Sequence, residues 1–485
     1  MKTKLFLSII MTLTTVLMTA QIQIGSDIDG EASGDELGAT VSLSSDGTIM
    51  AVGAPFNDGN GSNSGRTRVY QNLSGVWTQI GADLNGDMPE DVFGSSVSLS
   101  ADGNTLAVGI AKSDAGGLDS GAVKVFQNQS GVWTQLGSTI NGEAAGDKFG
   151  RFLATSSNGH ILAVGTPFHD SNGTNSGVVT VFEYSLGVWT PLGNKIYGSV
   201  NDYLGYSISL SSDGNIMAIG APLNGAGRAS VYQNISGVWT PIGLNIVGET
   251  AGDFFGGCVS LSSDGSKLAI GAYSDDTNGT VAGSVKVFQN QSGIWEQVGA
   301  KITGDVAGEW LGSFICLSSS GNVLVVGAPK SDANATDAGI VKIYQNQSGV
   351  WTLLGNRIYG EAAGDFSGVI ALSSNENVLA NGAYANDGGG ANSGHVRVYD
   401  LSSILANDSF VSDAFTIYPN PTKSDINITL DENQSLQKVN IYNPLGQLIA
   451  TDNKNNISLA TLPKGSYYVE VITNHGKATK SIIVE

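Results

Sequence analysis

The stretch SGVWTQIGADLNGD, from Ser74 to Asp87, decides the fold because its core returns along the chain. A Gly, an apolar residue, a Trp and usually a Thr recur six times, and the steps between successive Trp residues are 56, 56, 50, 56 and 56 residues. The six positions are Trp77, Trp133, Trp189, Trp239, Trp295 and Trp351. A period near fifty residues without helical spacing is typical of propeller blades and not of helical repeats.

Each repeat divides into four short strand-like runs. In the second repeat these runs are Phe93 to Ser100, Asn104 to Ala111, Gly121 to Asn128 and Gly131 to Gly137. Gly, Asn, Asp and Ser separate the runs, and the shortest connections predict hairpins. We name the runs a, b, c and d, and we predict that four antiparallel strands form one blade.

The runs a, b and c occur seven times, whereas the Trp-bearing run d occurs only six times. Run a begins near Gly38, Gly94, Gly150, Gly205, Gly256, Gly312 and Gly368. One period before Trp77 lies residue 21, and Gln21 to Gly38 aligns without a gap with Trp77 to Gly94. The sequence therefore predicts an all-β, seven-bladed propeller over residues 21–402 that is closed by its N-terminal strand. Closure removes the exposed sheet edges that invite aggregation.

Two residue types that recur between repeats admit a structural and a functional interpretation. The six Trp residues could stack on a ligand, or they could pack between neighbouring blades. We favour packing, because the Trp always stands at the same place in run d. Cys258 and Cys316 occupy similar places in consecutive repeats. We expect two small buried thiols rather than a disulfide, which requires a close pair of Cα atoms.

The first twenty residues have the layout of a secretory signal peptide: Lys2, Lys4, an apolar run and a small residue at Ala20. We expect cleavage after Ala20 and export. Without the two lysines the formal charge of −20 becomes −22, which argues against nucleic acid as a partner. No second apolar stretch approaches the roughly 18 residues of a membrane span. The mature chain is therefore expected to be exported, acidic and without a transmembrane segment.

The repeat resembles the FG-GAP repeats of integrin α-subunit propellers and their bacterial relatives. The resemblance rests on Phe93-Gly94 at the start of run a and on Val-Gly-Ala-Pro at Val52 to Pro55 and Val326 to Pro329. In integrin-type repeats the a-to-b loop holds calcium with several Asp and Asn residues. Here the loop is Ser-Ser-Asp-Gly or similar, with a single acid at Asp46, Asp102, Asp213 and Asp264. One carboxylate cannot supply the roughly six to eight oxygens that calcium takes, so we expect hairpin turns and do not carry this metal site over.

The tail from residue 414 resembles the C-terminal sorting domain of type IX secretion substrates in the Bacteroidetes. Its motifs include YPNP, KVNIYNPLGQLI and LPKGSYYVEV, and the positions that carry the resemblance are Tyr418, Pro419, Asn420, Pro421, Gly446, Gly465 and Tyr467. Short alternating runs broken by Pro and Gly predict a small β-sandwich over residues 414–485, with residues 403–413 as a linker. The resemblance implies the type IX secretion machinery as a partner. It also implies a secreted or outer-membrane surface location.

Acidic loops are predicted to share one face of the propeller. In an up-and-down blade the b-to-c and d-to-a loops lie on the same side. The b-to-c loops carry the candidate ligand-binding residues Asp58, Asp114, Asp170, Asp275 (followed by Asp276), Asp332 and Asp387. The d-to-a loops carry acid pairs such as Glu31 with Asp35 and Glu361 with Asp365. The fourth b-to-c loop is shorter, has no acid and carries Arg228.

Three interpretations of the acidic face remain open. The acids could cap turns and keep the protein soluble. They could bind an extracellular protein or glycan, with or without calcium. They could belong to a polysaccharide lyase or hydrolase, which unrepeated polar residues over a deep central pocket would favour. The histidines show no metal-ligand spacing, and no Ser/His/Asp set is apparent; they are His160, His169, His395 and His475. We expect a surface binding or adhesion module and not an enzyme, and we predict neither a catalytic residue nor a metal ligand.

Overall fold

A computed structural model describes residues 21–405, 415–430, 435–443, 448–473 and 476–485. The predicted signal peptide, most of the predicted linker and Gly446 lie outside the described residues. The chain divides into two compact units at Leu401 and Ser402. No helix among the described residues is long and apolar enough to cross a membrane. The helix α1 (Ser402–Leu405) opens the second unit.

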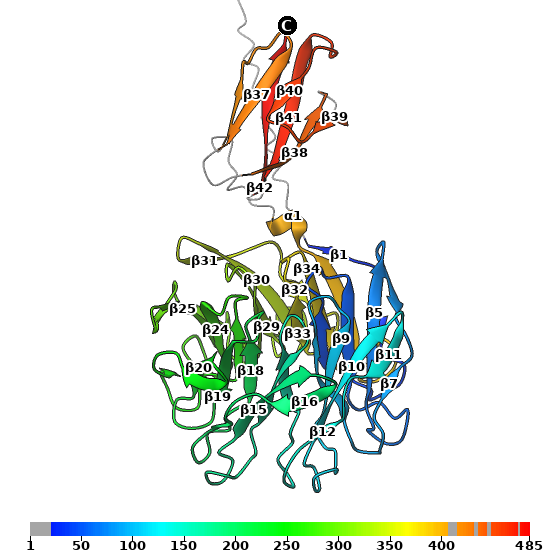
Figure 1. The fold of residues 1–485 in the computed structure, drawn as a ribbon, viewed down its shortest axis with the longest axis vertical. Helices are drawn as coiled ribbons and strands as arrows, with labels where there is room; N and C mark the ends of the chain where they lie inside the picture. The colour runs from blue at the N-terminus through cyan, green and yellow to red at the C-terminus, as the bar shows by residue number, and fades with distance from the viewer. Residues whose placement is uncertain (1–20, 406–414, 431–434, 444–447, 474–475) are drawn as a thin grey trace, which may run out of the picture. The chain divides into compact units, whose positions relative to one another are not determined.

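The first unit is a seven-bladed propeller, as the repeats predict (Figure 1). The innermost strands a are β3 (Thr40–Leu43), β8 (Phe93–Leu99), β13 (Phe152–Thr155), β18 (Ser207–Leu210), β23 (Cys258–Leu261), β28 (Phe314–Leu317) and β33 (Ser367–Leu372). Strands b are β4 (Ile49–Ala54), β9 (Thr105–Ile110), β14 (Ile161–Thr166), β19 (Ile216–Ala221), β24 (Lys267–Ala272), β29 (Val323–Ala328) and β34 (Val378–Ala383). Strands c are β5 (Arg66–Leu73), β10 (Ala122–Gln129), β15 (Val178–Ser185), β20 (Arg228–Ile235), β25 (Ser284–Gln291), β30 (Ile340–Gln347) and β35 (His395–Asp400).

The outer strand d of each blade is interrupted, so that it pairs with strand c in two short pieces. The first pieces are β6 (Val76–Gln79), β11 (Val132–Gln135), β16 (Val188–Pro191), β21 (Val238–Pro241), β26 (Ile294–Gln297), β31 (Val350–Leu353) and β1 (Ile22–Gln23). The second pieces are β7 (Leu84–Asn85), β12 (Ile140–Asn141), β17 (Ile196–Tyr197), β22 (Ile246–Val247), β27 (Ile302–Thr303), β32 (Ile358–Tyr359) and β2 (Ile28–Asp29).

The N-terminal segment closes the ring as predicted. Strand β1 pairs antiparallel with β35, and Ile22 lies opposite Asp400. Strand β2 continues along the same partner, so that Asp29 lies opposite His395. Figure 1 shows the blue strand β1 beside the last blade of the propeller. We number the blades one to seven by their strands a, so that blade seven contains β33, β34, β35, β1 and β2.

The hydrophobic core lies between neighbouring blades rather than inside one of them. One buried cluster joins Ala51 and Val69 of blade one to Phe93 and Leu106 of blade two. Because a flat four-stranded sheet exposes both faces, each blade needs its neighbours to bury its apolar residues. Equivalent clusters lie between other pairs of blades.

The Trp residues hold the blades together, which confirms the structural interpretation. At each of six seams, the indole Nε1 donates to a backbone carbonyl of the preceding blade over 2.9–3.1 Å. The donor and acceptor pairs are Trp77 with Ile24, Trp133 with Ile80, Trp189 with Leu136, Trp239 with Leu192, Trp295 with Ile242, and Trp351 with Val298. At the seventh seam Gln21 replaces the Trp, and its Oε1 accepts from the Asn356 amide at 3.1 Å.

A second set of hydrogen bonds links neighbouring blades at their a-to-b turns. At six of the seven seams, a backbone amide in or beside one a-to-b turn donates to a carbonyl of the corresponding turn in a neighbouring blade. The pairs are Ser45 with Ala101, Ala101 with Ser157, Ser157 with Ser212, Ser212 with Ser263, Ser263 with Ser319, and Asn375 with Ser45. Cys258 and Cys316 lie in the neighbouring strands β23 and β28 and are free thiols, as expected, but both residues are partly rather than fully buried.

The second unit is the predicted small β-sandwich. One sheet contains β36 (Phe415–Tyr418), β37 (Asp425–Leu430) and β40 (Asn456–Ser458). The other contains β39 (Leu448–Asp452), β38 (Leu436–Tyr442), β41 (Gly465–Thr473) and β42 (Gly476–Val484). Ile426, Val439 and Val469 are among the residues that fill the space between the sheets.

The residues of the sorting motif occupy distinct places in this unit. Tyr418, Pro419, Asn420 and Pro421 are exposed. Asn420 nevertheless fixes its segment to β42, because its Nδ2 donates to Ser481 O and its Oδ1 accepts from Ile483 N, both at 2.9 Å. Tyr467 is buried and donates to Pro463 O at 2.7 Å. Gly465 begins β41 opposite Val484.

Candidate functional site

The structure places the predicted loop aspartates in separate loops, where they cap their own turns. In five blades the carboxylate is exposed, and its Oδ1 accepts from the backbone amide five residues further on, over 2.7–2.9 Å. The pairs are Asp58 with Asn63, Asp114 with Asp119, Asp170 with Asn175, Asp332 with Asp337, and Asp387 with Asn392. One oxygen of each carboxylate is thus used by the loop itself. Ligand binding by these five residues stays a prediction.

Asp275 differs from the other five candidates. The capping residue of its loop is Asp276, whose Oδ1 accepts from Val281 N at 2.7 Å. Asp275 itself is buried and accepts from Lys301 Nζ at 3.0 Å and Ser284 Oγ at 2.8 Å. Burial by itself would raise the pKa of Asp275, but these hydrogen bonds and those from Thr277 outweigh it and bring the pKa to about 2.

The acids of the d-to-a loops bind basic residues of the next blade. Glu31 contacts Arg66 and Arg68, each at 2.8 Å. The same arrangement recurs around the ring in the pairs Asp87 with Lys124, Glu143 with Lys195, Glu249 with Lys286, Asp305 with Lys342, and Glu361 with Arg397. In blade four, Arg228 instead binds the buried Asp202. These acids therefore contribute to blade-to-blade contacts as well as to the surface charge.

The a-to-b loops do not fit the calcium cage of integrin-type repeats. They are tight turns, and the aspartate in four of them is engaged locally: Asp46 Oδ1 accepts from the Ser44 hydroxyl at 2.7 Å and from Thr48 N at 3.0 Å. Partial burial alone would raise the pKa of Asp46, yet the hydrogen bonds prevail and lower it. The aspartates of three other turns are held in the same way, namely Asp102, Asp213 and Asp264.

A central pocket of about 610 Å³ opens on the face that carries the b-to-c and d-to-a loops. All seven blades contribute to it through residues near the beginnings of their strands a, and blades one, five, six and seven also contribute residues that follow strand b. Its lining includes Glu36, Thr40, Arg151, Phe152 and Trp310. A rigid ring that surrounds one concave site is a common place for a ligand.

One residue of each d-to-a loop adopts a left-handed backbone conformation at this pocket face. These seven residues precede the repeated Phe/Leu/Ser-Gly pair, and their φ angles lie between 51° and 60°. They are Glu36, Val92, Lys148, Tyr203, Phe254, Trp310 and Phe366. Each such non-glycine residue costs roughly 1–3 kcal/mol. The backbone conformation recurs in every blade but the side chain varies, so the ring of turns presents six kinds of side chain at its seven positions.

An arc of aromatic side chains runs along blades three to six beside the pocket. Phe152 lies 4.9 Å from Tyr206, measured between ring centroids, and Tyr206 lies 6.3 Å from Phe254. Phe254 contacts Tyr273 at 4.7 Å, and Tyr273 contacts Trp310 at 5.4 Å. Such tilted and edge-on pairs are the favoured geometries of aromatic rings. The same row of side chains extends through Lys330 to Phe366 and Tyr384, and we call the whole set the aromatic arc.

The aromatic arc continues through a lysine into blade seven. Lys330 Nζ lies 5.6 Å from the Trp310 ring and 4.3 Å from the Phe366 ring, which is cation–π geometry. Phe366 in turn stacks on Tyr384 with centroids 5.5 Å apart and an angle of 7° between the planes. Trp310 is 36% exposed, so its ring is accessible to a ligand.

The pocket holds few charged groups. Glu36 is the one carboxylate among the described residues that line it, and Arg151 is the one cation. Burial raises the pKa of Glu36. Burial also raises the pKa of Tyr273 and Tyr384, so both hydroxyls remain protonated donors at neutral pH. The pocket therefore offers flat apolar faces edged by hydrogen-bonding groups.

Sequence reasoning missed this site because it followed what the repeats share. The signal was available in what they do not share: at one fixed position the chain carries Glu, Val, Lys, Tyr, Phe, Trp and Phe in turn. Unrepeated residues do surround a central pocket, but most of them are aromatic or apolar rather than polar.

Comparisons with known proteins agree with this architecture. Residues 27–70 and 248–288 match the family described as FG-GAP repeat. Residues 416–485 match the family described as secretion system C-terminal sorting domain. The propeller thus carries FG-GAP repeats, and the C-terminal unit is a type IX sorting domain, which indicates export to the outer-membrane surface or to the outside of the cell. No curated protein matches the sequence.

Several solved structures are similar to the chain at low identity. A protein from Bacteroides uniformis described as a 6-phosphogluconolactonase is 12% identical, covers 67% of this chain and 86% of its own, and has a TM-score of 0.49. The periplasmic gluconolactonase of Pseudomonas aeruginosa is 18% identical over 67% of this chain and 85% of its own, with a TM-score of 0.47. Hydrazine synthase of Kuenenia stuttgartiensis is 13% identical over 75% and 95%, with a TM-score of 0.49.

Proposed function

We propose that this protein is an exported binding module that holds a glycan in its central pocket, against the aromatic arc. The observation that carries the proposal is the series of rings from Phe152 to Tyr384, joined between Trp310 and Phe366 by Lys330, beside a pocket of about 610 Å³. Loops and turns on a rigid scaffold commonly carry binding residues.

The chemistry of the pocket suits a sugar ring. A pyranose has apolar C–H faces, which pack on aromatic rings, and hydroxyl edges, which need donors and acceptors. The tyrosine hydroxyls, Arg151 and Glu36 supply such groups beside the rings. The formal charge of −20 disfavours a strongly anionic polymer.

Binding rather than hydrolysis is supported by the acid count. Most glycoside hydrolases place two carboxylates about 5–9.5 Å apart across the scissile bond. Glu36 has no second carboxylate beside it among the described residues that line the pocket. We therefore propose no catalytic step. The exposed loop aspartates, such as Asp58 and Asp114, would contact those parts of a glycan or its carrier protein that extend past the pocket.

The test uses the fluorescence of Trp310. The chain has seven Trp residues; six serve the seams and the seventh, Trp310, lies at the pocket. Titration of the purified chain with a panel of oligosaccharides should change its emission, and the change should vanish in Trp310→Phe. Calorimetry should show at least a tenfold loss of affinity in Trp310→Ala and Phe366→Ala. Tyr197→Ala removes an exposed aromatic ring of blade three that does not line the pocket, and it serves as the matched control.

The opposite pattern would redirect the proposal. If an oligosaccharide binds and the pocket variants retain its affinity, the pocket is not the site. If Asp58→Asn with Asp114→Asn abolishes binding in that case, the acidic loops are the site instead. Turnover of the oligosaccharide would replace binding with catalysis.

A further inference from the structure

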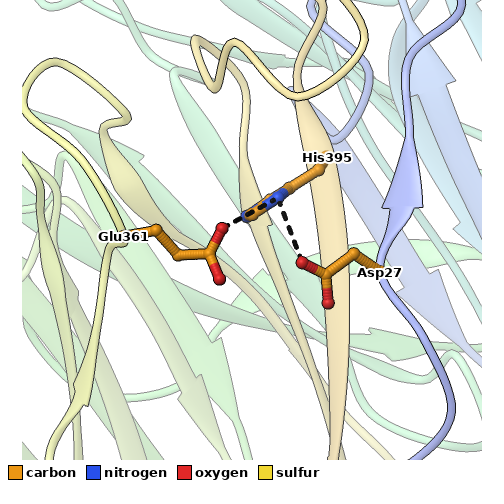
Figure 2. A group of neighbouring side chains, drawn as sticks. All are labelled: Asp27, Glu361 and His395. Atoms are coloured by element: carbon orange, nitrogen blue, oxygen red, sulfur yellow. Dashed lines mark ion pairs between the residues drawn. The ribbon is translucent and has the colours of Figure 1, made fainter.

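A histidine of the last blade lies among three carboxylates where the propeller closes. His395 begins β35 and is 1% exposed. Its Nδ1 lies 3.8 Å from Asp27 Oδ2, 3.9 Å from Asp29 Oδ1 and 4.0 Å from Glu361 Oε2. Figure 2 shows the carboxylates of Asp27 and Glu361 directed toward the imidazole from two different segments. The first segment is the N-terminal closing strand, and the second is the d-to-a loop before blade seven.

The carboxylate oxygens that face the imidazole are oriented by other residues. Gln23 Nε2 donates to Asp27 Oδ1 at 2.5 Å, which leaves Oδ2 toward His395. Arg397 Nη1 donates to Glu361 Oε1 at 3.2 Å, which leaves Oε2 toward His395. Outer hydrogen bonds that fix the ligating atoms in this way are typical of metal sites.

The imidazole itself lacks the partners that a buried polar group requires. His395 Nε2 is buried and has no hydrogen-bond partner, and the three approaches to Nδ1 are 3.8 Å or longer, beyond hydrogen-bonding distance. A buried polar atom without a partner costs roughly 1–3 kcal/mol. Nδ1, which faces the three carboxylates at distances too long for a hydrogen bond, is therefore placed to coordinate a further group between them.

Blade one shows what this position contains when no further group is needed. There Arg66 occupies the place of His395, because Arg66 lies opposite Asn85 as His395 lies opposite Asp29. The guanidinium of Arg66 contacts Glu31 at 2.8 Å and Asp83 at 3.2 Å. The arginine thus satisfies both acids directly.

The two blades differ in charge. In blade one, Glu31 and Asp83 are balanced by Arg66 and Arg68. In blade seven, three acids face one arginine, so that with a neutral imidazole the group carries a net charge of −2 (one arginine minus three carboxylates). The members of this group are Asp27, Asp29, Glu361, His395 and Arg397. The missing charge is that of one divalent cation.

We propose that Asp27, Glu361 and His395 bind a first-row divalent cation of the zinc class. One ligand atom from each of the three lies within 4.8 Å of the others. An imidazole with carboxylates is a ligand set that zinc and its neighbours accept, whereas calcium prefers oxygen alone. The ion would connect the N-terminal closing strand to blade seven and to the loop before it. Because it binds the folded ring and not the unfolded chain, it stabilises closure.

The test measures metal binding and stability in the chelator-treated, purified chain. Calorimetry with Zn²⁺ should show one site per chain, and Zn²⁺ should raise the thermal midpoint, with a smaller response to Ca²⁺. His395→Arg installs the residue of blade one, so it should fold without metal yet lose the response. Glu361→Gln should weaken Zn²⁺ at least tenfold. His169→Gln is the control, since His169 faces a single carboxylate, Asp147, at 3.9 Å.

Each result decides for or against the site. Retention of the Zn²⁺ response in His169→Gln, together with its loss in His395→Arg and Glu361→Gln, supports the proposal. Absence of Zn²⁺ binding to the unmodified chain overturns it. Equal affinity in the unmodified chain and in His395→Arg overturns it as well, because the ion would then bind elsewhere. The Trp310 variants should bind Zn²⁺ normally, so failure of the glycan proposal would leave this one standing.

Discussion

Truncation of one seam tryptophan tests whether these residues hold the ring together. Trp239 is 3% exposed, belongs to a buried cluster with Val181 and Met217, and donates to Leu192 O at 2.9 Å. Removal of a buried Trp side chain costs about 3–5 kcal/mol. About 1 kcal/mol of that is the expected net value of the hydrogen bond.

The expected shift of the thermal midpoint follows from the size of the propeller. At about 2.1 cal/mol/K per residue, roughly 380 residues give an unfolding entropy of about 0.8 kcal/mol/K. Trp239→Ala should therefore lower the midpoint by about 4–6 °C in a calorimetric scan. Trp239→Phe keeps an aromatic ring but leaves the Leu192 carbonyl without its donor, so it should lower the midpoint by a smaller amount, about 1–4 °C.

A fully exposed side chain provides the control for this experiment. Leu186→Ala changes a side chain that is 100% exposed and should leave the midpoint unchanged. If Trp239→Ala shifts the midpoint by less than about 1 °C, the seam argument is wrong. Loss of ligand binding without loss of stability would instead assign the tryptophans to recognition.

Three further predictions concern the closure of the propeller, its stability at low pH and the export of the chain. Gln21→Trp should raise the thermal midpoint, because it restores at the seventh seam the indole that the other six possess; an unchanged or lower midpoint would show that the Gln21 contact with Asn356 is already optimal. The folded pKa of Asp275 is about 2, below its usual value of 3.8, so its contribution to stability is present above about pH 4 and is lost as the pH falls toward 2. Asp275→Asn should accordingly melt earlier at pH 7 and approach the unmodified chain near pH 2; a constant difference across that range would contradict the assignment. Deletion of residues 415–485 should keep the protein inside the cell envelope, as judged by fractionation and surface labelling, and surface display of the shortened chain would refute the role of the sorting unit.

The repeats made the framework predictable, because periodicity reports what all blades have in common. The alignment of Gln21 with Trp77 placed the closing strand correctly, and the Tyr418 to Pro421 motif placed the sorting unit. Each of these two predictions rests on a motif that can be recognised within a short stretch of sequence. The sandwich followed from alternation in the same way.

Apart from the closing strand, the sequence did not predict which side chains of distant segments come into contact. Asp27 and His395 come from opposite ends of the propeller sequence, so no local spacing joins them. Asp275 and Asp276 are adjacent, so the sequence alone does not show which of them caps the loop, and the hydrogen bond from Val281 N to Asp276 Oδ1 does. The aromatic arc likewise depends on the ring that brings Phe152 and Tyr384 around one axis.

The pairing of β1 with β35 has a consequence for biogenesis. The earliest segment of the folded ring acquires its partner only when the last repeat has emerged, just ahead of the sorting unit. A truncated chain that lacks β35 would leave β1 unpaired and the propeller open, and the exposed segments would be sensitive to proteases. Closure of the ring therefore requires a chain that extends at least to the end of β35.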